Sequence, residues 1–208
     1  MSLIQQQIQE IQAELPQHVR LVAVSKYHPI SSLEEAYRAG QRIFGESKVQ
    51  EMTEKYNALP KDIQWHFIGH LQTNKVRQIV PFVHMIHSVD SVRLLEVINR
   101  EAEKIGRRVK VLLEVHVAKE ETKSGFMPEE ILSIVNSEAS YSSLSERPIA
   151  IQTIYPWVEI CGIMGMATNT DDQTEWRRCF REIKSIANTL SPIVQRVSHS
   201  LQSEHPII

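Results

Sequence analysis

The sequence of 208 residues predicts an α/β protein built around a parallel sheet. Six short apolar runs alternate with segments in which apolar residues recur at helical spacing. Each strand candidate is followed by a helix candidate, which is typical of parallel strands joined by right-handed crossovers. Two architectures fit this alternation, an open doubly wound sheet and a (β/α)8 barrel. A barrel usually needs about 250 residues, with about 200 as the lower limit, so this chain lies at that limit. Residues 193–197 are the one additional strand candidate.

The N-terminal segment predicts a helix followed by a buried strand. Isoleucine and leucine recur at helical spacing over residues 3–15, where Ser2 can cap the helix and Pro16 can end it. Residues 19–26 form a nearly continuous, β-branched apolar run. Such a run is typical of a strand that is buried on both faces.

The middle of the chain repeats this alternation. Ser32 and Glu35 have the spacing of a capping box, and the helix they introduce should end near Gly40. Further strands are expected at residues 42–45, 65–69, 83–90, 109–117 and 160–166. Helices are expected towards residue 59, from about residue 74, from Ser91 and from Pro128 to residue 135.

The last third of the chain is less regular. Residues 136–157 are rich in Ser and Pro without a clear period, so we interpret them as a loop or insertion. Thr170 and Gln173 can cap the final helix, which carries Trp176 and Phe180 and should end near residue 187.

Composition excludes several classes of protein. The net charge is -2, whereas a nucleic-acid-binding surface needs a clustered basic excess. No apolar run is long enough to cross a membrane, and the N-terminus lacks the pattern of a secretory signal. Two cysteines, Cys161 and Cys179, cannot form a disulfide framework or a four-thiolate zinc site. We therefore expect a cytoplasmic protein that is an enzyme or binds a small ligand.

Lys26 is the first candidate for chemistry. It follows a predicted strand, and ligands of parallel α/β proteins gather at the carboxyl ends of the strands. A partly desolvated lysine there presents a neutral amine that can attack a carbonyl carbon, as in a Schiff base with an aldehyde cofactor. The alternative is a solvated lysine at the end of a strand.

Other polar residues allow fewer conclusions. His66 and His70 are four residues apart, but the glutamate of a zinc-protease helix is missing between them. Histidines with hydrogen-bond partners in the core are therefore favoured over a metal site. Glu114 and His116 lie on one side of their strand, as an acid–base pair or as an interior layer of a barrel. No GxGxxG motif is present, which disfavours NAD and ATP.

Six motifs in order resemble those of one family. LVAVSK, IFGE, WHFIGHLQTNK, HSVD, KSG and GIMGMAT occur in the order seen in the pyridoxal-phosphate homeostasis proteins, which are alanine racemase N-terminal-domain-like proteins. The resemblance covers residues 3–187. It implies a (β/α)8 TIM-type barrel of the alanine racemase N-terminal-domain kind that binds pyridoxal 5'-phosphate.

The resemblance also implies roles for particular residues. Lys26 matches the lysine that holds the cofactor as a Schiff base. Ser88 and Met164 would lie near the cofactor and His66 close behind it, while Ser47 replaces an asparagine that the family places near the cofactor. Family members are viewed as cofactor carriers in vitamin B6 homeostasis, without an established catalytic turnover.

The C-terminal tail departs from the family. Residues 188–208 contain no counterpart of the Ser-x-Gly-Met-Ser loop and Arg-x-Gly strand end that hold the phosphate and complete the barrel. We therefore expect a single barrel domain over residues 1–208 that is incomplete at its last strands, as a frameshift or truncated gene would give, with weak cofactor binding through Lys26.

Two alternatives to a cofactor carrier stay open. One is a pyridoxal-phosphate-dependent amino-acid racemase or decarboxylase, and the other is a truncated, non-functional remnant. The expected partner is the small-molecule cofactor, with no nucleic acid and no membrane, and the expected state is a monomer.

Overall fold

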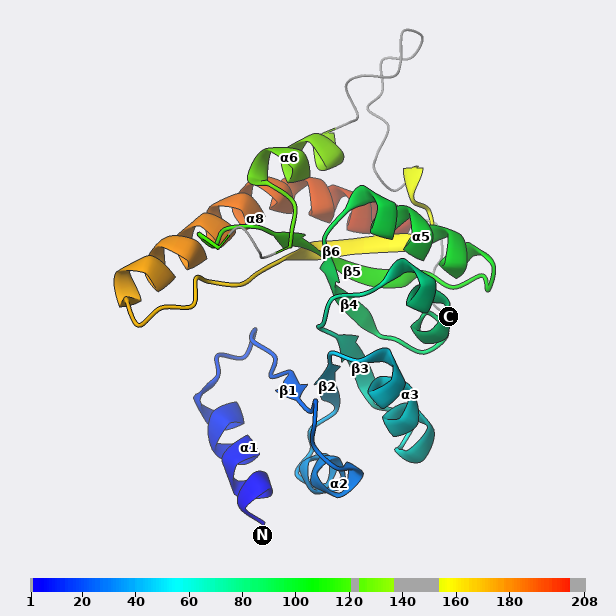
Figure 1. Ribbon diagram of the computed structural model, residues 1–208, viewed down its shortest axis with the longest axis vertical. Coiled ribbons are helices and arrows are strands. Elements are labelled where there is room, and N and C mark those ends of the chain that lie inside the picture. Colours follow the sequence, from blue (N-terminus) through cyan, green and yellow to red (C-terminus); the bar gives the residue numbers. More distant parts are fainter. Residues whose placement is uncertain (1, 121–123, 137–153, 203–208) are drawn as a thin grey trace, which may run out of the picture. The chain divides into compact units, whose positions relative to one another are not determined.

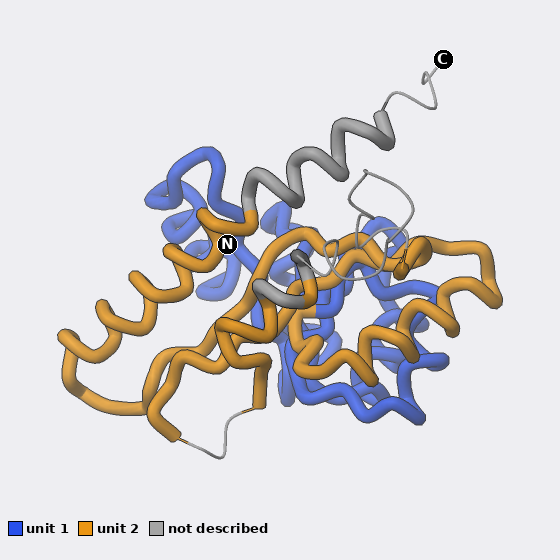
Figure 2. The backbone as a smooth tube through the Cα atoms, turned by 90° about the horizontal axis from the view of Figure 1, so that it is seen from above, with its two compact units in different colours: residues 1–86 blue, residues 87–208 orange. Residues whose placement is uncertain are grey.

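The computed structural model describes residues 2–120, 124–136 and 154–202. The chain divides into two compact units, Met1–Ile86 (unit 1) and His87–Ile208 (unit 2), which are coloured separately in Figure 2. Strand β4 (Met85–Val89) crosses the division. The expectation of one barrel domain over residues 1–208 stays a prediction.

Unit 1 alternates strands and helices in the predicted order (Figure 1). Its strands are β1 (Ala23–Val24), β2 (Ile43–Glu46), β3 (Gln64–Phe67) and the start of β4. Its helices are α1 (Leu3–Glu14), α2 (Ile30–Arg38), α3 (Val49–Ala58), the 3-10 turn η1 (Thr73–Lys75) and α4 (Val76–Ile79). Neighbouring strands pair in parallel, with Gly45 opposite His66 and Phe67 opposite Ile86.

Helix α1 confirms the expected N-terminal helix. The Ser2 hydroxyl accepts a hydrogen bond from the Gln5 N–H, and the Gln5 side chain returns one to the Ser2 N–H. This reciprocal capping box satisfies two backbone donors that the first turn of a helix leaves free. The helix ends at Glu14, one residue before its C-cap and two before Pro16.

Two expectations for the next segment are wrong. The strand predicted over residues 19–26 is only Ala23–Val24, and the Val24 side chain is 51% exposed instead of buried on both faces. Among the described residues β1 pairs with β2 alone, so its other edge lacks the neighbour that would cover it. Helix α2 begins at Ile30 after Pro29 and has no side-chain cap, so Ser32 lies inside the helix.

The core of unit 1 forms where the strands meet their helices. Phe44 of β2 and Trp65 of β3 are fully buried, with ring centroids 6.0 Å apart. Met52 of α3 and Phe67 of β3 are buried with them. Burying each large apolar side chain contributes about 1.5–3 kcal/mol, so this core fixes the carboxyl ends of β2 and β3.

Unit 2 continues the alternation. Its elements after β4 are α5 (Val92–Glu103), β5 (Val109–Val115), α6 (Pro128–Asn136), β6 (Val158–Gly165) and α8 (Gln173–Gln202). Strands β5 and β6 pair in parallel, with a register shift between Val111 and Leu112. Helix α5 confirms the expected start, because the Ser91 hydroxyl caps it by accepting from the Leu94 N–H.

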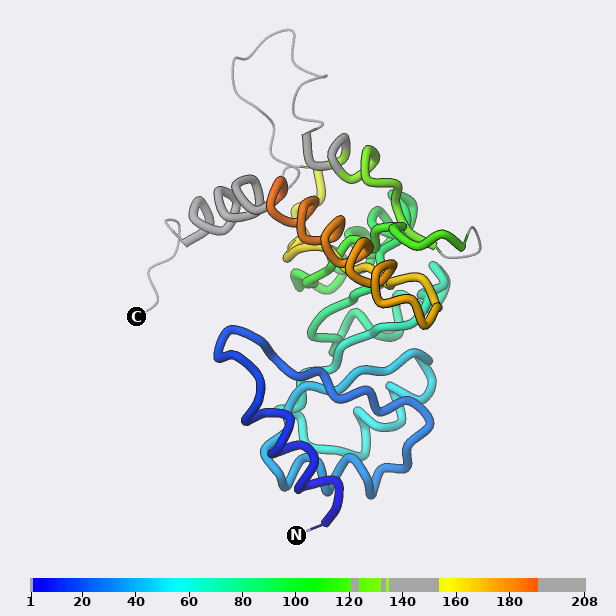
Figure 3. The backbone as a smooth tube through the Cα atoms, turned by 90° about the vertical axis from the view of Figure 1, so that its left-hand side faces the viewer, coloured from blue at the N-terminus to red at the C-terminus, as the bar shows by residue number. Residues whose placement is uncertain are grey.

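Helix α8 packs on β6 and differs from expectation at both ends (Figure 3). The cap is Asp172, whose Oδ1 accepts from the Thr174 N–H at 2.8 Å, and Thr170 instead accepts from the Asp172 N–H. The helix continues to Gln202, so residues 193–197 are helical and the expected strand there is wrong. A short apolar run fits either structure when considered alone.

The expected loop and the final helix complete the comparison of unit 2 with the sequence. Most of the loop expected at residues 136–157 lies outside the described residues. On α8 Cys179 and Ile186 are buried, whereas Trp176 and Phe180 are 39% and 59% exposed. Within the described part of the chain, none of the helices combines the length and apolar character that a membrane crossing requires.

Candidate functional site

Lys26 lies in a tight turn directly after β1. The turn is closed by the His28 N–H, which donates to the Ser25 carbonyl oxygen at 3.1 Å. Tyr27 has φ 66°, the left-handed conformation, which a non-glycine residue seldom adopts. Lys26 is exposed, which favours the alternative of a solvated lysine at the end of a strand.

A buried polar network lies against this turn. The Lys55 ammonium of α3 donates at 2.7 Å to each of three oxygens: the Ser25 carbonyl, Glu46 Oε1 and Glu51 Oε1. The Ser25 hydroxyl donates to Glu46 Oε1 at 2.6 Å. Glu51 Oε1 also accepts from the Tyr27 N–H at 2.7 Å. The network therefore holds the backbone on both sides of Lys26.

Burial and charge make this network sensitive to change. The Lys55 side chain is 5% exposed and the Glu46 side chain is 0% exposed. Burial alone would raise the pKa of Glu51, but the hydrogen bonds from Lys55 and from the Tyr27 N–H outweigh it and lower that pKa. A buried carboxylate beside a buried ammonium is stable only while both remain paired.

Ser47 lies at the same end of unit 1. It follows β2, and Gly69 follows β3. A side-chain carbon added at Gly69 would lie 2.4 Å from the Ser47 carbonyl oxygen, far inside contact distance. The two loops therefore pass each other at backbone distance, and glycine is required at this crossing.

His66 lies within a strand of the same sheet. It is buried on β3 opposite Gly45, and its ring stacks on that of His84 with centroids 5.4 Å apart. Unit 1 thus holds three of the predicted cofactor residues, Lys26, Ser47 and His66.

The other two predicted residues belong to unit 2. Ser88 is buried on β4, and Met164 is half-buried on β6 opposite Glu114. Next to Ser88, burial lowers the pKa of His87. The assignment of these five residues to one cofactor site stays a prediction.

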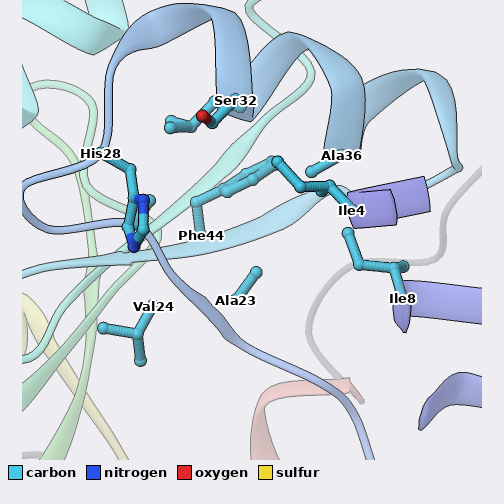
Figure 4. A pocket seen from close by; sticks show the side chains of 10 residues that line it. Ile4, Ile8, Ala23, Val24, His28, Ser32, Ala36 and Phe44 are labelled. Atoms are coloured by element: carbon cyan, nitrogen blue, oxygen red, sulfur yellow. The ribbon is translucent and has the colours of Figure 1, made fainter. Parts of the chain in front are cut away.

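Unit 1 also contains an apolar cavity of about 190 Å³ beside the turn (Figure 4). Ile4 and Ile8 of α1 and Phe44 of β2 line it, and His28 and Ser32 add polar atoms. Lys26, Ser47 and His66 do not line it, so this cavity is separate from the predicted cofactor residues.

Ionised groups also lie at the carboxyl ends of β5 and β6 in unit 2. Hydrogen bonds from Arg178 and Lys119 lower the pKa of Glu175 to about 2.

Burial raises the pKa of the Cys161 thiol on β6 to about 11, which makes it a poor nucleophile. In the part of the chain that the structure describes, no three His, Cys, Asp or Glu side chains are placed to hold a metal ion.

Sequence reasoning missed Glu46, Glu51 and Lys55. Two signals point to them: Glu46 ends the IFGE motif, and Glu51 and Lys55 are four residues apart on one helix. Such helical pairs are common on exposed surfaces, so their spacing alone does not indicate a buried network.

The turn at Lys26 fits an aldehyde ligand such as pyridoxal phosphate. It presents an exposed primary amine on a backbone that is held on one side by a buried hydrogen bond from Lys55 and on the other by a hydrogen bond to Glu51. An amine in this setting can be reached by a carbonyl carbon and form an imine with it.

Comparison with known proteins identifies relatives over most of the chain. The family model for the alanine racemase N-terminal domain matches residues 1–204. A pyridoxal phosphate homeostasis protein of Synechocystis is 36% identical over 185 residues, which cover 88% of this chain and 78% of that protein. The protein of the same name from Schizosaccharomyces pombe is 40% identical over 136 residues, and the aligned part spans only 56% of its length.

Solved structures of related proteins also match this chain. PipY of Synechococcus elongatus with pyridoxal phosphate bound is 32% identical, with a TM-score of 0.76 over 92% of this chain and 84% of that one. An alanine racemase of Clostridium difficile is 12% identical with a TM-score of 0.69, covering 94% of this chain and 47% of that one, which shows likeness of fold alone. The expected barrel-type α/β fold class is confirmed, and the chain belongs to the alanine racemase N-terminal domain family, in the group of the pyridoxal phosphate homeostasis proteins.

Proposed function

We propose that this protein binds pyridoxal 5'-phosphate through Lys26 and serves in pyridoxal phosphate (vitamin B6) homeostasis. The observation that carries the proposal is an exposed lysine at the end of β1, on a turn held by a buried hydrogen bond from Lys55 to the Ser25 carbonyl and by a hydrogen bond from the Tyr27 N–H to Glu51. It is supported by the similar PipY structure, which has pyridoxal phosphate bound.

The chemistry is reversible imine exchange. The cofactor supplies an aldehyde carbon. Lys26 would hold the cofactor through its amine as an imine, and the aldehyde oxygen would be lost as water. Hydrolysis reverses each of these changes, so the same lysine can hold and release the cofactor without consuming a substrate.

The remaining predicted residues complete the proposal. Ser47, His66, Ser88 and Met164 are assigned to the surroundings of the cofactor. The protein is further proposed to act in the cytoplasm as a monomer, without nucleic-acid partners, in line with its net charge of -2.

A visible absorption titration with pyridoxal phosphate tests the proposal. Wild-type protein should give a saturable imine band, and Lys26→Ala should give none. Lys104→Ala is the matched control, because Lys104 is an exposed lysine on the surface of unit 2. An equal band in Lys26→Ala, or no band in the wild type, would overturn the proposal.

Amino-acid turnover decides whether the bound cofactor also supports catalysis. Sustained exchange of the α-proton of an amino acid that is lost in Lys26→Ala would establish a racemase-like or decarboxylase-like enzyme. Cooperative unfolding that does not respond to cofactor, together with no imine band, would identify a non-functional remnant.

A further inference from the structure

We infer that Glu51 is a positioning residue for Lys26 and acts by holding Tyr27 in its left-handed conformation. This inference rests on the proposed function, because it assigns to Glu51 a part in imine formation at Lys26. Glu51 does not reach the reacting atoms. It acts through the backbone of the turn.

The first step is the conformation of the turn. Tyr27 has φ 66°, and Lys26 precedes it within the turn closed between Ser25 and His28. A bulky residue in this region is strained by contact between its side chain and its own backbone. Turns of this kind usually place glycine or asparagine at such a position. The surrounding structure must therefore favour this conformation at Tyr27.

The second step is the group that favours it. The Tyr27 N–H donates to Glu51 Oε1 at 2.7 Å, a short, charge-assisted hydrogen bond. Glu51 cannot turn away freely, because the same oxygen accepts from the Lys55 ammonium at 2.7 Å. Lys55 is fixed in turn by Glu46 Oε1 and by the Ser25 carbonyl. The two peptide groups that flank Lys26 are thus tied to one buried ammonium.

The third step separates the two lysines. Lys55 is buried, and its three N–H donors match the three oxygens at 2.7 Å, so its amine has no lone pair or space for a carbonyl carbon. Lys26 is exposed. The same network that holds the turn therefore directs an aldehyde to Lys26 and away from Lys55.

The test is a double-mutant cycle read by the imine band in titrations with pyridoxal phosphate. Glu51→Ala should weaken binding about tenfold, since left-handed strain at a non-glycine residue is of this size. Glycine adopts this conformation without strain, so Glu51→Ala should cost less than about threefold in the Tyr27→Gly background. Glu54→Ala, at an exposed position of the same helix, is the control and should leave binding unchanged.

Two additional measurements keep the result decisive. Glu51→Gln keeps an oxygen acceptor for the Tyr27 N–H and should bind within about threefold of the wild type. Borohydride reduction of the imine followed by peptide mass spectrometry should label Lys26 and not Lys55.

The outcomes separate this inference from the proposed function. A wild-type protein without an imine band contradicts the function itself. If the wild type gives a band and Glu51→Ala weakens binding equally in both backgrounds, or not at all, only the role of Glu51 is overturned. A tenfold loss in folded Glu51→Gln, or a label on Lys55, also overturns it.

Discussion

Replacing Lys55 by methionine should destabilise the protein severely. The substitution keeps the volume and the apolar stem of the side chain but removes three hydrogen bonds of 2.7 Å. It leaves the carboxylate of Glu46, 0% exposed, without a cation. Breaking a buried pair in this way costs about 3–5 kcal/mol, a large part of the roughly 5–15 kcal/mol that keeps a domain folded.

The assay is equilibrium unfolding in urea, monitored by circular dichroism. Lys104→Met is the matched control, because Lys104 bonds Glu101 at 2.7 Å on the surface and should lose less than about 1 kcal/mol. Adding Glu46→Gln should recover about 1–2 kcal/mol, since it removes the unpaired charge.

A loss of less than about 1 kcal/mol in Lys55→Met would refute this reasoning. So would an equal loss in Lys55→Met with and without Glu46→Gln, because the penalty is assigned to the unpaired carboxylate.

Three other predictions follow from groups in the two units. The pKa of Glu175 falls from an ordinary 4.5 to about 2, so its stabilisation is present above pH 4.5 and is lost as the pH falls towards 2. The difference in melting temperature between wild type and Glu175→Gln should therefore close on acidification, and a constant difference would contradict this. The pKa of Cys161 is about 11, so iodoacetamide should modify it slowly at neutral pH and faster in alkali, as peptide mass spectrometry can measure; rapid neutral labelling of folded protein would be incompatible. Gly69→Ala should lose about 1–3 kcal/mol in urea unfolding through collision with the Ser47 carbonyl, and wild-type stability would show that the crossing is not tight.

Much of the fold can be read from local sequence. The helix at Ser91 was predictable because a capping serine and helical spacing coincide, and both act within one element. The strand at residues 19–26 was not, because an apolar run does not reveal whether a strand has neighbours on both sides. The strand predicted at residues 193–197 was wrong for a related reason. A five-residue apolar run fits a strand when considered alone, but the helix that contains it begins twenty residues earlier.

The candidate site shows the same division. Lys26 could be found from its place after an apolar run, although its exposure could not. Glu46 and Lys55 were missed because a charged residue is buried only when tertiary structure supplies its partner. The left-handed Tyr27 has no sequence signal, since such turns are normally recognised by glycine or asparagine.

The placement of the three tryptophans gives the protein built-in optical reporters. Trp65 is 1% exposed on β3 of unit 1, while Trp157 and Trp176 belong to unit 2 and are more accessible. A buried indole emits at shorter wavelength and resists soluble quenchers. In protein carrying Trp157→Phe and Trp176→Phe, the fluorescence would come from Trp65 alone, which precedes His66 on β3. Unfolding of unit 1 could then be followed without a tryptophan signal from unit 2.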